Sequence, residues 1–259
     1  MVESYRQTAQ AAFLQGALRW HGFLMRDIGF EQLGDELAVN YFAHRKGARV
    51  PNNSAFVLRF FADLAEATGD EAYLAPCAGL LTFLARVQKE TGELPYAVKG
   101  IADGKNREHF QCYQYNAFQC LDLMRYYRFT GDKAALPLIT KVLTFLAKGG
   151  LAEDGHARYD CGSHYRIVTY HTAVLAAAFT EAGRLGIPGY DRLASRAFAY
   201  LLSVQRSDGS FAHSQREHLL LSDQRSYPRN LAMILYHVLS SMPQERLSDV
   251  TFSVGELVT

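Results

Sequence analysis

Chemically versatile side chains are concentrated between residues 153 and 174, in the sequence EDGHARYDCGSHYRIVTYHTAV. Seven consecutive residues of this segment include Tyr165, Arg166, Tyr170 and His171. An imidazole can act as a base near neutral pH, a phenol with a perturbed pKa can donate a proton, and a guanidinium group binds a carboxylate through two parallel hydrogen bonds. These groups suit a reaction in which a proton is removed from a carbon beside a carboxylate.

Further polar residues at related positions are candidates for binding the same substrate. They are Asn53, Asn116, Arg225 and Arg229. Asn116 is expected at the His171 position of the preceding copy of a repeat, and Asn53 at or near it in the copy before that. Each candidate also has a structural alternative, because polar residues at helix starts cap or pack and arginine often pairs with a nearby carboxylate.

Histidine, aspartate and cysteine side chains in the same segment raise the question of a metal site. The candidate ligands are His156, Asp160, Cys161 and His164. Their spacing, H-x3-D-C-x2-H, is not one we can assign to a zinc site, and zinc requires tetrahedral convergence of its ligands. We therefore expect no metal and no cofactor. Cys112 and Cys120 lie eight residues apart on one helical face, which favours core packing over a redox pair.

The overall charge excludes some classes of partner. The 259 residues include 27 basic and 26 acidic side chains, so we expect no general attraction to nucleic acid or to an anionic membrane. No apolar window is long enough to span a membrane, and the first residues, MVESYRQTAQ, do not resemble a signal peptide. The cysteine spacing favours reduced thiols. We expect a cytoplasmic protein.

Apolar residues recur at steps of three and four along most of the chain, which predicts a largely helical protein with hardly any strand. The chain also repeats itself in units of about sixty residues. Units begin near Asn52, Gln114 and Thr169, and each contains a helix, a short glycine turn and a second helix. The turns contain Gly69-Asp70, Gly131-Asp132 and Gly186 to Gly189, because glycine ends one helix and aspartate can cap the next.

A fourth unit is divided between the two ends of the chain. The segment from Ser226 matches the first helix of the unit, and the segment from about Tyr5 to Met25 matches the second. Pairing these helices would close four hairpins into a ring and bury every apolar face. The sequence therefore predicts one all-α domain over residues 1–259, with first helices inside and second helices outside.

Four connections of about 20 residues join each second helix to the next first helix, so they must lie at one end of the ring. They span residues 27–52, 89–111, 148–167 and 206–227. Long ordered connections in a compact domain usually carry function. The segment from 153 to 174 includes one of them, and we expect the active site there.

The repeating hairpin and the turn Gln205-Arg206-Ser207-Asp208-Gly209-Ser210-Phe211 resemble the α/α-toroid proteins. That superfamily includes squalene cyclases, prenyltransferase β subunits, and lyases and epimerases of uronate polysaccharides. The strings QYNAFQCLDLMRYYRFTGD and SDQRSYPRNLAMILYHVL also look like uncharacterised toroid proteins of bacterial exopolysaccharide gene clusters. The resemblance implies an α/α toroid of about four hairpins that acts on carbohydrate.

The branches of this superfamily differ in their motifs. The chain has no DxDD motif, and Asp160 and Cys161 are adjacent, whereas the DxC pair of prenyltransferases has one residue between them. Toroidal alginate lyases carry a DG turn, then an arginine, then a YH pair; Asp154-Gly155, Arg166 and Tyr170-His171 follow that order. The NNH signature of those lyases is half present, as Asn52-Asn53-Ser54.

We expect a lyase or epimerase of an acidic, uronic-acid-containing glycan, with His171 as base, Tyr170 or Tyr165 as acid, and Arg166 with Asn116 on the carboxylate. An inverting glycosidase would need two facing carboxylates, for which Asp103, Asp160 and Asp223 are candidates. Two alternative functions stay open: an isoprenoid-binding toroid and a non-catalytic glycan-binding or scaffold protein. The sequence is also compatible with a homodimer.

Overall fold

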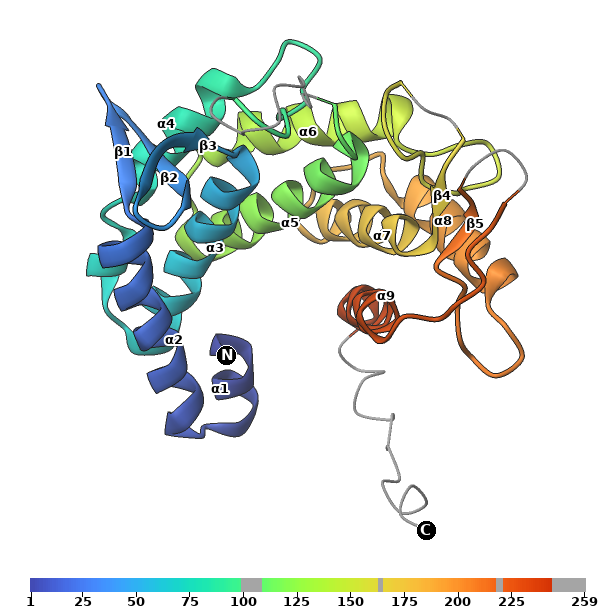
Figure 1. The fold of residues 1–259 in the computed structure, drawn as a ribbon, viewed down its shortest axis with the longest axis horizontal. Helices are drawn as coiled ribbons and strands as arrows, with labels where there is room; N and C mark the ends of the chain where they lie inside the picture. The colour runs from blue at the N-terminus through green and yellow to red at the C-terminus, as the bar shows by residue number, and fades with distance from the viewer. Residues whose placement is uncertain (99–108, 163–164, 218–220, 244–259) are drawn as a thin grey trace.

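The computed structural model describes residues 1–98, 109–162, 165–217 and 221–243. The described chain is an arc of helical hairpins, with α1 and α2 at one end and α9 at the other (Figure 1). This is the α/α-toroid arrangement that the repeat predicts. No helix of the described residues is long and apolar enough to cross a membrane.

Four inner helices follow one another along the arc, and each packs against the next. They are α3 (Pro51–Thr68), α5 (Cys112–Thr130), α7 (Thr169–Arg184) and α9 (Pro228–Ser241). Proline at the first turn of α3 and of α9 suits a helix start, because the first amides of a helix have no partner within it. The predicted first helices are confirmed.

The second helix of each hairpin lies on the outside of the arc (Figure 1). These outer helices are α4 (Cys77–Val87), α6 (Ala135–Gly149) and α8 (Asp191–Val204), and a 3-10 turn, η2 (Glu71–Leu74), precedes α4. The hairpin turns use the predicted chemistry. Gly69 and Gly131 end their helices with positive φ values of 72° and 67°, and the carboxylates of Asp70 and Asp132 accept hydrogen bonds from amides two residues ahead.

The N-terminal segment departs from the single helix expected over residues 5 to 25. It forms α1 (Val2–Thr8) and α2 (Ala11–Phe23), followed by a short π-helix, η1 (Leu24–Ile28). Ala9 separates α1 from α2 because its φ of 54° is left-handed. Helix α1 packs on α3 through Arg6, which pairs with Asp63 and Glu66.

The structure does not show the predicted pairing of the two chain ends. In Figure 1, α2 and α9 lie at opposite ends of the arc. The apolar residues of α9 belong with those of α7 and α8, whereas Trp20 of α2 packs on the core formed around α3 to α7. Helix α9 contacts the first hairpin through Tyr236, whose hydroxyl lies 3.5 Å from Nη2 of Arg59.

The long connections contain strands that the sequence analysis did not predict. The first holds an antiparallel sheet of β1 (Phe30–Leu33), β2 (Glu36–Phe42) and β3 (Arg45–Arg49). A tight turn at Gly34, with a φ of 67°, joins β1 to β2. In addition, β4 (Ile167–Val168) pairs with β5 (Ser214–Arg216) and joins the third connection to the fourth.

Contacts between successive connections place all four at one end of the arc. The amide of Val98 donates to the carbonyl of Arg49, and the amide of Thr169 donates to the carbonyl of His213. The second and third connections meet where Gln111 Nε2 donates to the hydroxyl of Tyr159, at 2.7 Å. The prediction of a shared end is confirmed for the described residues.

Candidate active site

One side chain near the start of each of the first three inner helices holds the preceding connection in place. The side-chain oxygens of Ser54, Asn116 and Thr172 accept hydrogen bonds from the backbone amides of Val39, Leu94 and Ala157, at 3.2, 2.8 and 3.0 Å. All three side chains are fully buried. The shared contact aligns the repeats, and it makes Thr172, not His171, the equivalent of Asn116.

Each connection has an aromatic side chain two residues after the residue that donates this amide. The ring residues are Tyr41, Tyr96 and Tyr159, and the same step from Phe211 in the fourth connection leads to His213. Each of the last three meets the start of an inner helix. Tyr96 lies 5.1 Å from Tyr115 between ring centroids, Tyr159 stacks on His171 at 5.6 Å, and His213 Nδ1 lies 2.6 Å from Asn230 Nδ2.

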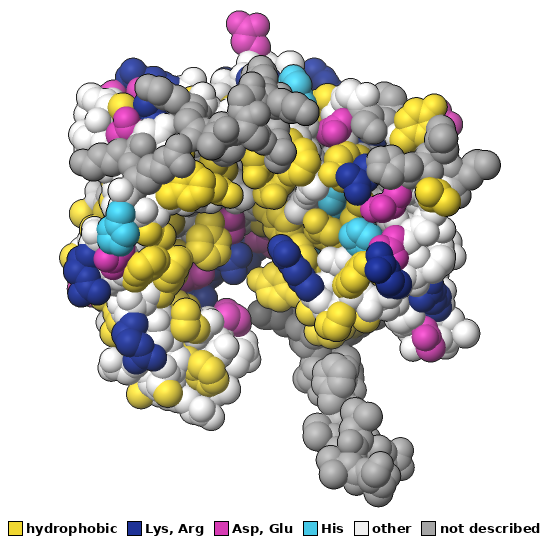
Figure 2. Space-filling model, viewed as in Figure 1, with side chains coloured by type: hydrophobic (Ala, Val, Ile, Leu, Met, Phe, Trp, Pro, Cys, Tyr) yellow, Lys and Arg dark blue, Asp and Glu magenta, His cyan; other side chains and the backbone are white. Residues whose placement is uncertain are grey.

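We call this group of residues the mouth. It consists of the ring residues Tyr41, Tyr96, Tyr159 and His213, with Tyr115, Tyr170, His171, Arg229 and Asn230 from the inner helices. Phe110 adds a ring between Tyr96, Tyr115 and Tyr159. Figure 2 shows histidine, basic and acidic side chains together near β4 and β5, beside hydrophobic side chains. The mouth therefore combines aromatic surface with acid–base groups.

His171, the predicted base, lies behind the surface of the mouth. It is 1% exposed, and the ring of Tyr170 meets its imidazole edge-on at 4.6 Å. Burial lowers the pKa of His171 to about 3, and His213 and Arg166 act in the same direction. Nδ1 of His171 has no hydrogen-bond partner in the described protein. His171 is therefore a neutral imidazole with one unused nitrogen, and its catalytic role stays a prediction.

Arg166 contacts Tyr159 and Glu217, two residues that the sequence analysis did not single out. Its guanidinium group lies 4.7 Å from the ring of Tyr159 and donates both to the hydroxyl of that ring, at 3.1 Å, and to Glu217, at 3.0 Å. The same carboxylate lies 3.6 Å from Nε2 of His213. Arg166, Glu217 and His213 thus lie in a row along one side of the mouth.

His213 could have been found from the repeat. Tyr96, Tyr159 and His213 each follow a turn glycine by four residues, the glycines being Gly92, Gly155 and Gly209. The identity of the residue changes from tyrosine to histidine in the last copy, so a search for similar residues overlooks it.

The other predicted residues have varied surroundings. Tyr170 is half-buried at the mouth, and burial raises the pKa of its phenol, partly opposed by Arg229. Tyr165 is 61% exposed and lies beside Arg216 instead of in the mouth. Asn53 is half-buried near the start of α3.

Three of the proposed ligand-binding side chains are distinguished by their partners. Asn116 uses its oxygen and both amide hydrogens on Leu94 and the carbonyl of Cys112. Arg225 is engaged by Asp223 through two hydrogen bonds of 2.9 and 2.7 Å. Arg229, by contrast, is exposed, and within the described residues it forms no ion pair. Of the three, Arg229 is the side chain available to an incoming anion.

A cavity of about 620 Å³ lies between the four inner helices, with Arg229 among its lining residues. Figure 2 shows acidic and basic side chains inside a hollow between α3, α5 and α9. Asp122 in this lining pairs with Arg59 at 3.2 Å. Burial raises the pKa of Asp122 to about 6, and Arg59 limits the rise. Glu181 pairs with Arg128 and Arg184 further along the same cavity.

The residues first considered as metal ligands do not gather in the described structure. His156 pairs with Asp154 at 2.6 Å, and Asp160 accepts from the amide of Gly162. His164, like Asp103 among the carboxylates, lies outside the described residues. Cys161 instead lies beside Cys112, with the two sulfurs 3.0 Å apart. Cys112 and Cys120 both lie in the buried core, as expected, and Cys112 has Cys161 as an additional neighbour.

Comparisons with known proteins show which solved structures share this fold. No protein-family model matches the chain, and no curated protein matches it. A solved structure described as a possible member of the GH105 family from Salmonella enterica is 13% identical, with a TM-score of 0.70, over 92% of this chain and 68% of that one. A cellobiose 2-epimerase from Spirochaeta thermophila is 12% identical, with a TM-score of 0.72, over 98% and 72%.

A polysaccharide lyase is also similar, at 12% identity and a TM-score of 0.67, over 97% of this chain and 72% of that one. The chain thus shares the α/α-toroid fold of these three proteins and spans about 70% of the length of each. Because hydrolase, epimerase and lyase share the fold, the fold leaves the reaction open.

Proposed function

We propose that this protein is a carbohydrate-active enzyme that binds a glycan at the mouth and moves protons there with imidazole and phenol groups. The observation that carries the proposal is the pair of histidines, His171 and His213, set in a wall of tyrosine rings beside two arginines. Sugar rings have apolar faces that pack on aromatic side chains and hydroxyl groups that hydrogen-bond to polar ones. The mouth offers both surfaces.

The finer proposal is a substrate that contains a uronic acid. Arg229 is exposed and free of an ion pair within the described residues, so it is available to a carboxylate, and Arg166, which pairs with Glu217, adds positive charge at the mouth. Neutralising the carboxylate acidifies the neighbouring C5–H bond because the negative charge that develops there is stabilised. Both β-elimination and C5 epimerisation begin in this way.

We assign proton abstraction to His213. Its side chain is 22% exposed, whereas His171 is buried and its lowered pKa makes it a weak base. In an elimination, His213 takes the C5 proton, the C4–O bond breaks, and the leaving oxygen receives a proton from Tyr170. In an epimerisation, His213 keeps the C5 proton, and Tyr170 delivers a different proton to the opposite face of C5. His171, packed against Tyr159 and Tyr170, orients both phenols.

The charged part of the cavity lining favours a sugar over an isoprenoid substrate. Arg59, Asp122 and Glu181 form ion pairs there, beside apolar side chains such as those of Phe56, Phe118 and Met233. Asp122 also keeps a hydrolytic alternative open, because a carboxyl group with a raised pKa suits a general acid.

The test incubates the full chain with acidic polysaccharides, their oligosaccharides and neutral disaccharides. Elimination produces absorbance from an unsaturated uronate, epimerisation carries solvent deuterium into C5, and hydrolysis releases reducing ends. We expect one of the first two signals, reduced at least about a hundredfold in His213→Ala, since general acid–base catalysis contributes about 10²–10⁴. His156→Ala, which changes a histidine paired with Asp154 outside the mouth, serves as the control.

The outcomes test separately the general proposal, a carbohydrate-active enzyme, and the finer one, a substrate that contains a uronic acid. Turnover of a neutral sugar alone would contradict the uronate assignment and keep the carbohydrate-active enzyme. Binding without turnover of any sugar would indicate a glycan-binding protein. Hydrolysis that is lost in Asp122→Asn and kept in His213→Ala would move the chemistry to the cavity.

A further inference from the structure

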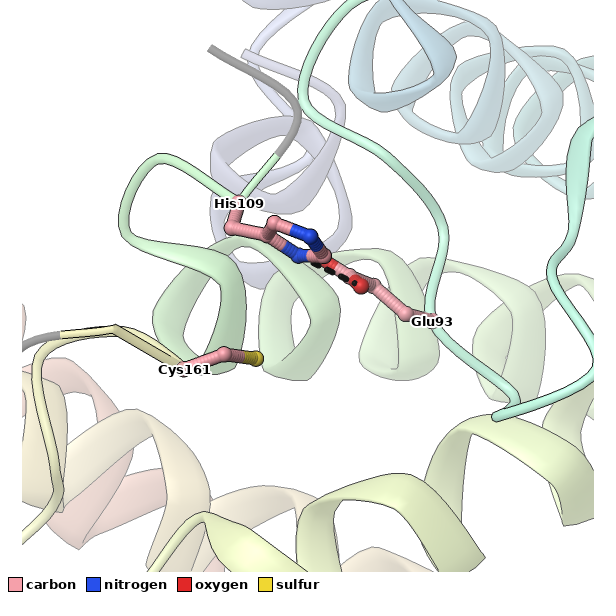
Figure 3. A group of neighbouring side chains, drawn as sticks. All are labelled: Glu93, His109 and Cys161. Carbon is pink, nitrogen blue, oxygen red and sulfur yellow. Dashed lines mark hydrogen bonds and ion pairs between the residues drawn. The ribbon is translucent and has the colours of Figure 1, made fainter.

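Three side chains of metal-binding type, Glu93, His109 and Cys161, lie together where the second and third long connections meet, and a fourth, Cys112, lies beside Cys161. Glu93 comes from the second connection and His109 from its end, Cys161 comes from the third, and Cys112 begins α5. Figure 3 shows Glu93, His109 and Cys161 pointing toward a common centre from separate segments. The ligand atoms of these three residues all lie within 4.8 Å of one another.

The distances within the cluster are close to those around a bound ion. Nδ1 of His109 lies 2.9 and 3.0 Å from the two carboxylate oxygens of Glu93, and the sulfur of Cys161 lies 3.0 Å from that of Cys112. Around a tetrahedral zinc ion, bond lengths of about 2.0–2.3 Å place neighbouring ligand atoms about 3.3–3.8 Å apart. To hold an ion, side-chain rotations would separate the atoms within each pair and bring the sulfur of Cys112 toward the group of Glu93, His109 and Cys161.

The types of ligand select the metal. Thiolate and imidazole are ligands of zinc and similar transition metals, whereas calcium and magnesium prefer oxygen. A carboxylate–imidazole pair or two neighbouring thiols can occur alone for structural reasons. Here the carboxylate–imidazole pair and the pair of thiols lie together, although Glu93 and Cys161 are 68 residues apart in the sequence. Neither pair by itself explains why the two are adjacent.

The surroundings also suit a metal. The side chain of Glu93 is 2% exposed, and Nζ of Lys89 lies 3.5 Å from one of its oxygens. The phenol of Tyr113 lies close enough to Cys161 to lower the pKa of its thiol. Such outer contacts orient metal ligands in proteins. The His109 side chain is 51% exposed, so an ion can reach the cluster from solvent.

We propose that Glu93, His109, Cys112 and Cys161 form a structural zinc site that ties the second long connection to the third. The residues next to these ligands form one wall of the mouth: Phe110 follows His109, and Tyr159 precedes Cys161 by two positions. Zinc there fixes the position of that wall. The proposal is independent of the reaction catalysed at the mouth.

The experiment measures metal on the full chain, purified under reducing conditions and without chelator. We expect about one zinc per chain, and Co²⁺ added to the metal-stripped protein should give the charge-transfer band of thiolate ligands and the intense absorption of tetrahedral cobalt. Cys161→Ser and His109→Ala should weaken Co²⁺ binding more than about tenfold, because loss of an outer contact alone costs about 10–100-fold. His156→Ala should bind like the wild type.

A second measurement on the wild type avoids the risk that a variant fails to fold. Zinc added to the stripped, reduced protein should protect Cys112 and Cys161 from alkylation and leave the labelling of Cys77 and Cys120 unchanged, with peptide mass spectrometry as readout. The proposal is overturned if the wild type binds neither zinc nor cobalt, if Cys161→Ser binds cobalt with unchanged affinity and spectrum, or if zinc does not protect the two thiols.

Discussion

The ring of Tyr159 stacks on the imidazole of His171, with centroids 5.6 Å apart and an interplanar angle of 23°. One repeat earlier, Tyr96 meets Tyr115 at 5.1 Å, and one repeat later, His213 meets Asn230. The same contact between a connection and an inner helix is thus made three times with different side chains. This variation on a fixed backbone position produces a mouth with aromatic groups on one side and acid–base groups on the other.

Replacing Asn116 by alanine should destabilise the protein by about 2–3 kcal/mol. The substitution leaves the buried amide and carbonyl of Leu94 without their partner, and an unsatisfied buried polar group costs about 1–3 kcal/mol. Asn116→Thr should recover part of the loss, because Thr172 makes the equivalent bond to Ala157. Urea denaturation measures both. Equal losses in the two variants would contradict the role given to this contact.

Gly155→Ala should destabilise the protein more than Gly209→Ala. Both glycines have positive φ values, 98° and 81°, so both variants carry a backbone strain of about 1–3 kcal/mol. At Gly155 a Cβ atom would lie 2.4 Å from the carbonyl oxygen of Arg196 in α8, whereas at Gly209 the nearest atom is 3.9 Å away. Thermal unfolding of the two variants gives the difference, and a larger loss at Gly209 would refute the explanation.

Stability should fall on acidification because His171 is held neutral. Burial lowers its folded-state pKa to about 3, below the unfolded value of about 6.5, so the unfolded chain binds the proton first as the pH falls. The stability is present above about pH 6.5 and is lost toward pH 3. One pKa unit corresponds to about 1.36 kcal/mol, so His171 contributes a loss of about 2 kcal/mol at about pH 5.

The variant His171→Phe isolates this contribution. It removes the titrating group and keeps a ring to stack on Tyr159, so its free energy of unfolding should depend less steeply on pH between about 6.5 and 4. His237, whose pKa is lowered to about 4 by burial, provides a residual slope in both proteins. Identical slopes for wild type and variant would show that His171 does not titrate as described.

Arg166→Lys should lower kcat/KM for an acidic glycan at least about tenfold, a change of about 1.4 kcal/mol. A lysine cannot donate at once to Tyr159 and Glu217 with the geometry of a guanidinium group. Arg86→Lys, on an exposed arginine that pairs with Asp35 and Glu36, is the matched control and should have little effect. If both variants respond equally, Arg166 has no special place at the mouth.

Local features of the chain could be predicted from the sequence because each is encoded within a few residues. The turns at Gly69-Asp70 and Gly131-Asp132 follow from the left-handed tolerance of glycine and the capping capacity of aspartate. The helical hairpins follow from apolar spacing, and the repeat makes an arc of them. The shared end of the long connections could also be predicted, since each joins a second helix to the next first helix.

Only the tertiary structure decided which of these residues meet. The sequence places Asn116 near the His171 position, but the hydrogen bonds align it with Thr172, because a shift of one residue turns a helical side chain by about 100°. Glu93 and Cys161 are brought together by the stacking of separate hairpins, and His213 reaches Asn230 because the fourth connection folds back on itself, with the amide of His213 donating to the carbonyl of Arg225. Spacing along the chain determines the faces of each helix, whereas contacts between connections depend on the packing of whole hairpins.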